Sequence, residues 1–582
     1  MTGTVFGIVL LPCNLKSQTF TPPVDYEITL AGNFGEPRPN HFHGGLDIRT
    51  EGVEGKHIYA IGDGYVSRIT VGKDGFGNAV YITHPTGHTS VYCHLKAFSP
   101  RIKAALRRYQ YKHKTCEADA RLTPLDVPVS QGQFIALSGN TGHSTAPHLH
   151  LEIHDTRTWN MLDPYQFLND FIQDTVPPQA HAFMAIPQHG GTFNGSFANK
   201  LFNLPSLGEG QGVGYSLGEG QGVGIAWGKV GFAIWADDYM QGADNHYGIH
   251  ETQLYVDGRL VFHSIVDNIP LSHNRMVNSW GYYDHWRRHH SWYMKSYIEP
   301  GNRLSCLQAD ENRGIIDFNE ERDYHLEYIL RDFKGNEARY PFTVHATPNP
   351  SRMGGEIGYS QALNLSELPS RSGGVGGGFL LWNRTNSYSR PGVQLIVPYG
   401  FVAADTPFNP FIIRQPDAYS DACQFADVSL PLMADARLSL YVRRTFTDSI
   451  VNTFDSSKLY ITNENGSFFG GDYHDGWVTG FIRELAGRYE VAYDDQPPTV
   501  KPLSFNGDRL TLSVTDGQSG IATWTATVDD RFIVFDAIEK STTFACELRE
   551  SWLRPTGKSH HLRFEVTDNR RNTQIYESSF NY

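Results

Sequence analysis

Residues 142–154 read GHSTAPHLHLEIH, and polar side chains alternate there with apolar ones. A period of two is typical of a half-buried β-strand. The alternation places His148 and His150 on the same face of that strand, where both can reach one site. The apolar residues that would fill the other face are Leu149, Leu151 and Ile153.

Two further stretches carry histidines in a strand-like context. Residues 41–48 read HFHGGLDI, in which a Gly-Gly turn separates His43 from Asp47 and lets their side chains converge. Residues 91–95 read VYCHL and place His94 near a strand end. Taken singly, each histidine fits a hydrogen-bonded strand residue. Together, two histidines and one aspartate form a three-ligand set with an open fourth position, which is typical of a catalytic zinc.

The order H-x-x-x-D, then Y-x-H-L, then S-G-N-T-G-x-S-x-x-P-H-L-H-x-E resembles the lysostaphin or LytM type of zinc peptidase, which cleaves the peptide part of bacterial peptidoglycan. The resemblance spans roughly residues 31–167. It implies that His43, Asp47 and His150 bind Zn²⁺, and that His94 and His148 handle protons and stabilise the transition state. An insertion between Leu95 and Val129, and Ala146 where the family commonly has Gly, bear on substrate fit.

The function that the resemblance implies is a zinc-dependent endopeptidase that hydrolyses peptide cross-links of peptidoglycan, with a water activated by zinc and two histidines. One alternative is a catalytically silent protein of the same fold that binds the wall or activates an amidase. Degenerate members of the family usually lose ligands, and all five positions are filled here. A second alternative is a peptidase of secreted proteins, such as Gly-rich chains.

The insertion predicts a short surface helix. Ser99 and Pro100 fit the N-cap and first helical positions, and Ile102, Leu106 and Tyr109 recur at helical spacing. Its polar positions are mostly basic, which leaves two interpretations open: an ordinary solvated face, or a contact with anionic wall polymer. The basic residues are Arg101, Lys103, Arg107, Arg108, Lys112 and Lys114.

The rest of the 582-residue chain contains an internal repeat. Asp174-x-x-Pro177-Pro178 recurs as Asp494-x-x-Pro497-Pro498, and both copies close on an Asp and an Asn four residues apart. With 57 Gly and 31 Pro, the composition favours turns and short strands, and alternating runs such as 510–514 predict strands. We therefore expect two β-sandwich modules of immunoglobulin or fibronectin-III character.

The expected fold class is mainly β: an N-terminal antiparallel-sheet zinc peptidase domain with a short helical insertion, followed by three β-sandwich-like domains. The predicted boundaries are 1–18 for a candidate signal peptide, 19–172 for the peptidase domain, 173–347 for a β-sandwich module with an insertion, 348–493 for a third β domain after a Gly-rich linker at 370–378, and 494–582 for the last module. Short glycine-rich stretches at 62–64, 75–78 and 138–142 predict hairpin turns.

Charge and hydropathy limit the partners. The net charge of −13 lacks the cationic surplus that a nucleic-acid ligand requires. After the first residues, no apolar run approaches the roughly 18 residues of a membrane span, so we expect no stable span. The six cysteines show no metal-binding or disulfide spacing. We expect an exported, periplasmic or envelope-associated protein whose partners are peptidoglycan peptide stems; the oligomeric state stays open.

Overall fold

A computed structural model describes residues 19–72, 75–203, 222–348, 378–426, 431–443, 454–538 and 540–582. The candidate signal peptide at 1–18 and residues 370–377 of the Gly-rich linker lie outside these ranges. The prediction of a mainly β chain is confirmed, since strands far outnumber helices in the order of elements. No helix in the described part of the chain has the length and apolar character needed to cross a membrane.

The N-terminal body is built on an antiparallel sheet with the strand order β1-β4-β13-β8-β7-β6-β10. On β13, Leu149, Leu151 and Ile153 are fully buried in one core, as the alternation predicts. The bounds along this order are Leu30–Gly32, Gly45–Arg49, His148–Asp155, His88–Cys93, Ala79–Thr83, Gly64–Val71 and Ala118–Arg121. Strands β11 (Pro128–Val129) and β14 (Met161–Leu162) pair with this sheet at β6 and β13.

Smaller elements complete this body. A three-stranded sheet has the order β5-β12-β9, with bounds His57–Tyr59, Phe134–Leu137 and Ala97–Phe98. A short ribbon joins β2 (Pro37–Arg38) to β3 (His41–Phe42). Helix α1 spans Pro100–His113, and α2 (Tyr165–Leu168) with the 3₁₀ helix η1 (Asn169–Phe171) ends the body.

The second body is an eleven-stranded sheet whose main path is β17-β15-β18-β26-β25-β19-β20-β23. The bounds along this path are Lys200–Asn203, Gln179–Pro187, Gly222–Asp237, Glu337–Ala346, Arg322–Arg331, Glu251–Val256, Arg259–Ile265 and Leu307–Ala309. Three strands pair with β18 off the path: β16 (Thr192–Phe193), β22 (Met294–Lys295) and β24 (Ile316–Phe318). Between β20 and β22 lie β21 (Asn268–Ile269), η2 (Leu271–Met276), α3 (Val277–Trp280) and α4 (Tyr283–His289).

The first two bodies are joined by pairing and by packing. Strand β21 pairs with β14, which extends the N-terminal sheet into the second body. Phe34 and Phe42 of the first body lie in the hydrophobic core of the second, and Met240 and Tyr247 of the second lie in the core of the first. The N-terminal body therefore depends on its neighbour for part of its apolar burial.

The third body consists mainly of two sheets that enclose one apolar core. One sheet has the order β28-β29-β33-β36-β35, with bounds Asn386–Arg390, Val393–Val397, Pro431–Tyr441, Trp477–Glu484 and Asp472–His474. The other has the order β31-β32-β37-β34, with bounds Phe411–Ile413, Ala422–Gln424, Tyr489–Tyr493 and Leu459–Asn463. A pair formed by β27 (Gly378–Leu380) and β30 (Thr406–Phe408), and the 3₁₀ helix η5 (Ser456–Lys458), complete it.

The C-terminal body has two four-stranded sheets around a further core. The first runs β38-β39-β43-β42, with bounds Thr499–Asn506, Arg509–Thr515, Thr543–Glu547 and Asp536–Ala537. The second runs β41-β40-β44-β45, with bounds Arg531–Ile533, Ile521–Val528, Ser559–Asp568 and Thr573–Asn581, and η6 covers Leu548–Glu550. The β architecture agrees with the expected sandwich-like modules; their immunoglobulin character and the exact domain boundaries stay predictions.

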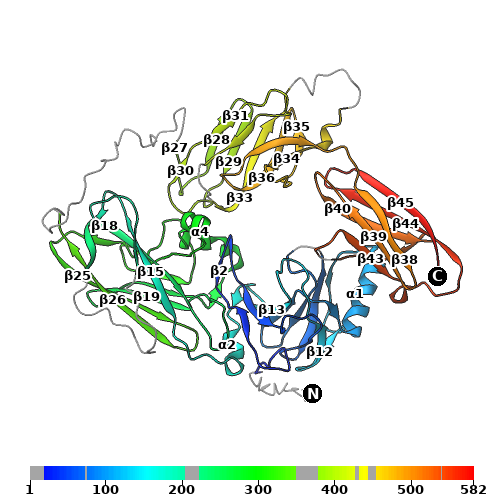
Figure 1. Cartoon of the computed structure of the whole chain (residues 1–582), viewed down its shortest axis with the longest axis horizontal. Coiled ribbons are helices and arrows are strands. Elements are labelled where there is room, and N and C mark those ends of the chain that lie inside the picture. The colour runs from blue at the N-terminus through cyan, green and yellow to red at the C-terminus, as the bar shows by residue number, and fades with distance from the viewer. Residues whose placement is uncertain are drawn as a thin grey trace, which may run out of the picture.

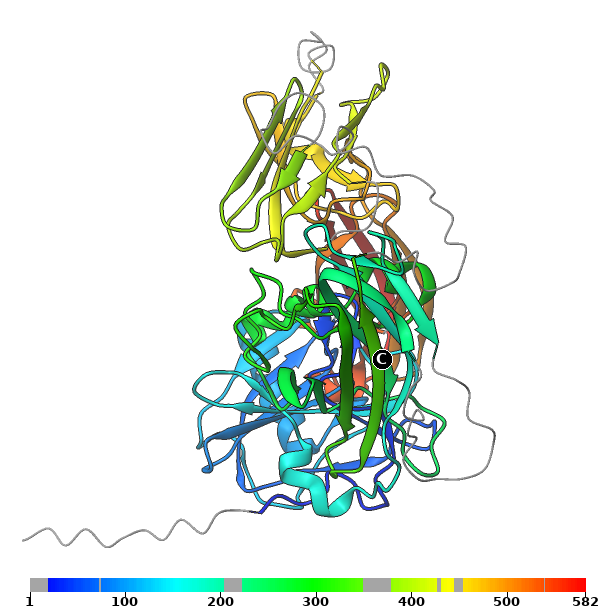
Figure 2. The ribbon, with the colours of Figure 1, turned by 90° about the vertical axis from the view of Figure 1, so that its left-hand side faces the viewer.

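Figure 1 shows the four bodies arranged in a ring, in which the C-terminal body returns to helix α1 of the first. In Figure 2 the third body stands above the other three. The return contact accounts for two of the six basic residues of the insertion helix. Arg107 pairs with Asp536 at 3.0 Å and with Glu550 at 3.3 Å, and Lys103 also pairs with Glu550. Part of this face is thus an intramolecular interface, which neither sequence interpretation anticipated.

We expect Arg107→Ala to destabilise the docking of the C-terminal body by about 1–2 kcal/mol, because two charge-assisted contacts of a largely buried guanidinium are lost. The measurement is denaturant unfolding followed by the fluorescence of Trp524 and Trp552. Arg108→Ala is the matched control, since Arg108 is exposed on the same helix. Equal unfolding midpoints for the two variants would contradict the assigned interface.

Candidate metal centre and active site

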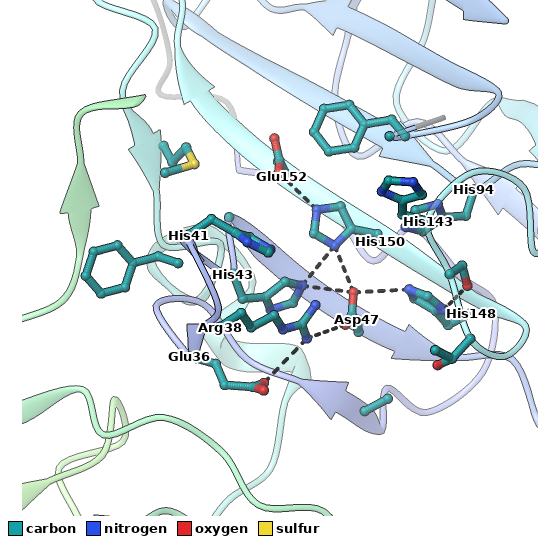
Figure 3. A pocket seen from close by; sticks show the side chains of 18 of the residues that line it. Glu36, Arg38, His41, His43, Asp47, His94, His143, His148, His150 and Glu152 are labelled. Atoms are coloured by element: carbon teal, nitrogen blue, oxygen red, sulfur yellow. Dashed lines mark hydrogen bonds and ion pairs between the residues drawn. The ribbon is translucent and has the colours of Figure 1, made fainter. Parts of the chain in front are cut away.

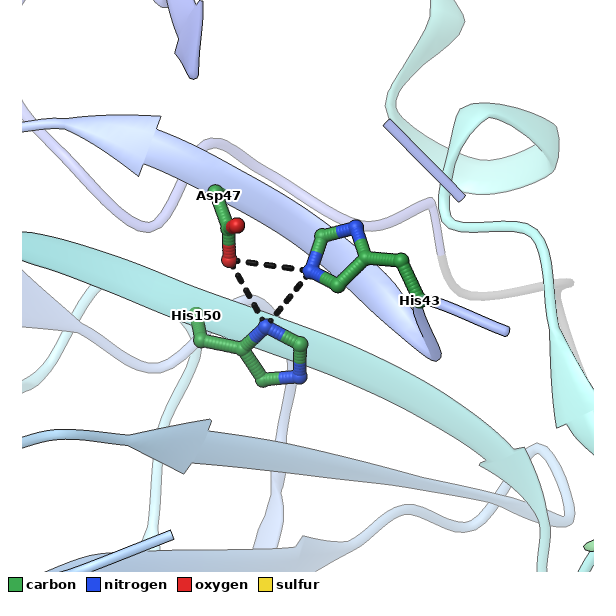
Figure 4. Close-up of side chains that lie close together, drawn as sticks. All are labelled: His43, Asp47 and His150. Carbon is green, nitrogen blue, oxygen red and sulfur yellow. Dashed lines mark hydrogen bonds and ion pairs between the residues drawn. The ribbon is translucent and has the colours of Figure 1, made fainter. Parts of the chain in front are cut away.

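Three of the predicted site residues converge at the start of β4 and on β13, as Figure 4 shows. His43 Nε2 lies 3.0 Å from Asp47 Oδ1 and 2.9 Å from His150 Nδ1, and His150 Nδ1 lies 2.8 Å from Asp47 Oδ1. All three side chains are buried. Two imidazole nitrogens and a carboxylate oxygen are ligands that zinc takes, so the donor set fits this ion. The strand register sets the geometry, because His150 is the partner of Asp47 between β13 and β4.

The other ring nitrogen of each histidine is held in place. His43 Nδ1 lies 2.6 Å from the backbone carbonyl of Asn33, and His150 Nε2 lies 3.0 Å from a Glu152 carboxylate oxygen. The second Glu152 oxygen lies 2.6 Å from His154 Nε2. Such outer partners fix the tautomer and orientation of metal-binding histidines. The nitrogen of each histidine that would bind the metal is therefore already oriented toward the point where the three side chains meet.

The electrostatics of the centre favour a bound cation. Burial opposes ionisation of Asp47, but His43 and hydrogen bonds from His148 and His150 hold its pKa well below the usual range. Burial lowers the pKa of His43 to about 4. For His150, burial is outweighed by hydrogen bonds to Asp47 and Glu152, which raise its pKa to about 9. Asp47 and Glu152, which stabilise the proton on His150, would also stabilise a metal cation that replaces this proton.

Arg38 completes the support of Asp47. Its guanidinium donates to Asp47 Oδ2 at 2.9 Å and lies 3.5 Å from Glu36. The oxygen of Asp47 that Arg38 binds is not the one that faces the histidines, so the carboxylate is held from behind with Oδ1 free to act as a ligand.

The two predicted catalytic histidines lie beside this centre (Figure 3). The rings of His94 and His148 are 4.9 Å apart, and His94 lies 5.7 Å from the ring of His150. His94 follows β8 directly, with the unusual backbone angle φ of 59°, and its Nδ1 lies 2.7 Å from the carbonyl of Thr141. His148 Nε2 lies 3.2 Å from Asp47 Oδ1. All five predicted site residues are therefore brought together.

The centre opens into a cavity of about 1110 Å³. Besides the five site residues, its wall includes Leu271 and Asn274 of η2, from the second body. Asn274 Oδ1 accepts a hydrogen bond from the backbone N–H of Phe42 at 2.6 Å. The second body thus supplies part of the wall beside the metal ligands, which makes it a structural part of the site.

Sequence reasoning missed several residues of the site. Glu152 and His154 continue the alternation of residues 148–154, so the signal for their shared face was present. Arg38 and Asn33 carry no such local signal, because their contacts depend on a loop and on a neighbouring body. Asn33 accepts a hydrogen bond from the Gly248 N–H and donates one to the Gly248 carbonyl, both at 2.8 Å.

This pair of contacts leads to a prediction. Asn33→Ala frees the segment whose carbonyl orients His43, so we expect metal affinity to fall by about 10-fold, the lower end of the range for outer-shell partners. Competition with a chromogenic chelator measures the affinity. Asn160→Ala is the control, because Asn160 also donates to the second body, at Asn268, but lies off the metal centre. Unchanged affinity in the Asn33 variant would show that Gly248 does not support the ligand.

Comparison with known families identifies this part of the chain. Residues 41–111 match Peptidase family M23, and residues 378–494 match the Zu5-like domain. The chain therefore contains an M23 peptidase domain, and the family resemblance read from its motifs is confirmed.

Two curated proteins and one solved structure are similar to this part of the chain. The chain is 31% identical over 138 residues to an uncharacterized metalloprotease of Haemophilus influenzae, covering 24% of this chain and 22% of the relative. It is 33% identical over 138 residues to the peptidoglycan DD-endopeptidase ShyA of Vibrio cholerae, covering 22% and 26%. The match thus spans about a quarter of each relative. The catalytic domain of lysostaphin from Staphylococcus simulans is 24% identical, with a TM-score of 0.18, over 24% of this chain and 89% of that structure.

Proposed function

We propose that the chain is a zinc-dependent endopeptidase that hydrolyses the peptide cross-links of bacterial peptidoglycan. The observation that carries the proposal is the convergence of His43, Asp47 and His150 at one cavity. His43 and Asp47 lie inside the segment 41–111 that matches Peptidase family M23, and His150 reaches them from β13, beyond that segment. A relative named as a peptidoglycan DD-endopeptidase supports the substrate class. An envelope location, reached by export, follows from that substrate.

His43, Asp47 and His150 would hold the ion through Nε2, Oδ1 and Nδ1. When bound, zinc would supply a Lewis acid that polarises the scissile carbonyl and makes a water more acidic. The cavity beside the three ligands provides room for a peptide and a water.

His94 is the better candidate for the general base. Burial, followed by the neighbouring His150 and His148, lowers its pKa to about 3, so the ring is neutral near pH 7 but weakly basic; the assignment rests on its position and tautomer. Because Nδ1 faces the Thr141 carbonyl, an acceptor, Nδ1 carries the hydrogen and Nε2 keeps a free lone pair. A neutral imidazole with this tautomer can take a proton from an attacking water.

His148 is the better candidate for stabilising the developing oxyanion. Its Nδ1 lies 2.8 Å from the Ala146 carbonyl, and its Nε2 lies 3.2 Å from Asp47 Oδ1. The Ala146 carbonyl is an acceptor, so this contact is a hydrogen bond when Nδ1 carries hydrogen. Nε2 is the ring atom on the side of the metal ligands, where an N–H can donate to the negative charge that forms on the carbonyl oxygen.

The silent alternative is disfavoured by the complete set of site residues and by their outer-shell support. A peptidase of secreted proteins would use the same centre, so only the substrate distinguishes this alternative from a peptidoglycan endopeptidase. We also propose the boundaries 19–172, 173–347, 348–493 and 494–582 for the domains. The cavity wall from η2 supports a role for the second domain in substrate positioning.

Mass spectrometry of purified cross-linked muropeptides, incubated with the full chain, tests the proposal. We expect discrete products in which one peptide cross-link has gained a water, with loss of cleavage on chelation and recovery on adding zinc. Binding of muropeptides without new fragments would contradict the proposal and favour the silent alternative. Cleavage of Gly-rich proteins with muropeptides left intact would favour the secreted-protein alternative.

A further inference from the structure

A second group of acidic side chains lies outside the active site, where the first body meets the second. Asp174 lies in the connection between η1 and β15, Asp238 directly follows β18, and Asp332 directly follows β25. One carboxylate oxygen of each residue lies within 4.8 Å of those of the other two. The three residues are only 8%, 6% and 3% exposed. Three buried carboxylates so close together require an explanation.

Ion pairs do not provide one: Lys334 lines a small cavity beside the group, but its ammonium donates to the Asn169 carbonyl. Among the described residues, none of the three carboxylates forms an ion pair with a lysine or arginine. Asp332 accepts hydrogen bonds from the N–H and side-chain amide of Asn336 at 2.9 and 2.6 Å, and Asp174 accepts one from the Val176 N–H at 3.0 Å. Oδ1 of Asp238 is buried without any hydrogen-bond partner. A buried carboxylate oxygen without a partner is costly, so this oxygen requires either a proton or a ligand.

The charge distribution supports the same conclusion. Burial, followed by the charges of Asp174 and Asp332, raises the pKa of Asp238 to about 9. Burial also raises the pKa of Asp174 to about 6, with Asp332 contributing. Two occupants can relieve this repulsion: protons on the carboxyl groups, or a cation between them.

The geometry favours the cation. Two oxygens bound to one Ca²⁺ lie at most about 5 Å apart, twice the Ca–O distance of about 2.3–2.6 Å, and the three aspartate oxygens satisfy this limit. Asp174 and Asp238 also line a cavity of about 10 Å³, about the size that one water or one ion occupies. The group offers carboxylate oxygens and no thiolate or converging imidazole pair, and oxygen ligands suit calcium better than zinc.

We propose that Asp174, Asp238 and Asp332 bind one Ca²⁺ that fixes the joint between the peptidase domain and the second body. The position of the group between the two bodies supports this role. Asp174 belongs to the connecting segment itself, while Asp238 and Asp332 end strands of the second body. The next residue after Asp332, Phe333, stacks on Tyr165 of the first body at 5.0 Å. An ion at this place would hold the connection, the second body and the Phe333 contact in one arrangement.

The repeat in the C-terminal body offers an internal comparison. Asp494, Asp516 and Asp568 form a similar group, and each stands at the matching end of a connection or strand. In this second group, as far as the structure describes it, every buried carboxylate oxygen has a hydrogen-bond partner. Asp494, for example, accepts from the Gln496 and Ser519 N–H groups at 3.1 and 3.0 Å. The unpartnered oxygen of Asp238 therefore distinguishes the first group, and we assign an ion to that group alone.

Calcium binding to the full, zinc-loaded chain tests the proposal. Equilibrium dialysis at neutral pH, with free Ca²⁺ up to about 5 mM, covers the range of extracellular calcium modules. We expect Asp238→Asn to bind one Ca²⁺ fewer per chain than the wild type. Asp237→Asn is the matched control, because it removes a neighbouring charge that pairs with His181 and His246 instead, and it should bind as many ions as the wild type. An equal count in Asp238→Asn, or no binding to the wild type, would overturn the proposal.

Limited proteolysis of the wild type gives a test that needs no variant. We expect Ca²⁺ to slow cleavage within residues 172–178 by at least several-fold, because the ion would hold the connecting segment. Mg²⁺ at the same concentration is the control, since its stricter octahedral geometry fits a fixed three-carboxylate group less well. The same cleavage rate with and without Ca²⁺ would overturn the proposal.

Discussion

Alanine in place of His43, Asp47 or His150 is expected to reduce the metal content from about one zinc per chain to near zero, and hydrolysis to background. The reason is that two remaining protein ligands hold the ion too weakly. Elemental analysis of dialysed protein measures the loss. The remaining imidazole and carboxylate groups are buried, so circular dichroism must show that each variant is folded.

His41→Ala is the matched control for metal content. His41 lies two residues before His43 and also lines the cavity, but its Nδ1 contacts the Pro39 carbonyl and it is not a proposed ligand. We expect this variant to keep its zinc. Full zinc occupancy in all three ligand variants would mean that the ligands are misassigned.

His94→Ala and His148→Ala are expected to keep zinc and to lose about 10²–10⁴-fold in turnover, the usual contribution of a positioned acid or base. Neither residue belongs to the ligand set, yet both rings face the same cavity. Turnover of a cross-linked muropeptide and metal content are measured on the same samples. His57→Ala is the control, because His57 is exposed on strand β5 and does not line the cavity.

Each of these two residues is tested separately. If the His94 variant retains near-normal turnover, it is not the base, and if the His148 variant does so, the oxyanion role is wrong. Loss of zinc from either variant would instead place that residue among the ligands.

The five site residues could be named from the sequence because their motifs resemble those of a known peptidase family, although His150 lies more than 100 positions from His43 and Asp47. The alternation of residues 148–154 fixes which side chains share a face. The Gly-Gly turn predicted between His43 and Asp47 is wrong, because Gly45 already begins β4; the two glycines instead allow β13 to approach closely, since a Cβ there would collide with Glu152 and with the Leu151 carbonyl. Contacts that depend on distant segments could not be read in this way. Asn33 supports His43 through its carbonyl, and its own side chain is held by two hydrogen bonds with the backbone of Gly248, which belongs to the second body. The basic residues of α1 likewise found their partners in Asp536 and Glu550, more than 400 positions away along the chain.

The glycine-rich turns show a related limit. Residues 75–78 do join two paired strands, β6 and β7. The stretches at 62–64 and 138–142 do not form hairpins, because β5 and β12, which precede them, belong to the three-stranded sheet and the strands that follow belong to the main sheet. Turn residues predict a change of direction, but the choice of pairing partner depends on the whole fold.

The aspartate group was only partly visible in the repeat. Asp174 and Asp332 have matching positions in the two copies of the repeat. The third aspartate does not, because the copies differ in length: ten residues separate Asp238 from Ile249 in the first copy, and four separate Asp516 from Ile521 in the second. The pattern therefore indicated homologous modules without indicating that three carboxylates meet.

The central claim is that His43, Asp47 and His150 hold the ion that the hydrolysis requires. Anomalous diffraction from crystals of the zinc-loaded full chain, recorded on both sides of the zinc absorption edge, tests it most directly. The account predicts a peak between His43 Nε2, Asp47 Oδ1 and His150 Nδ1, with a sharp change in strength across the edge. The absence of a peak there, or a zinc peak only at another place in the chain, would contradict it.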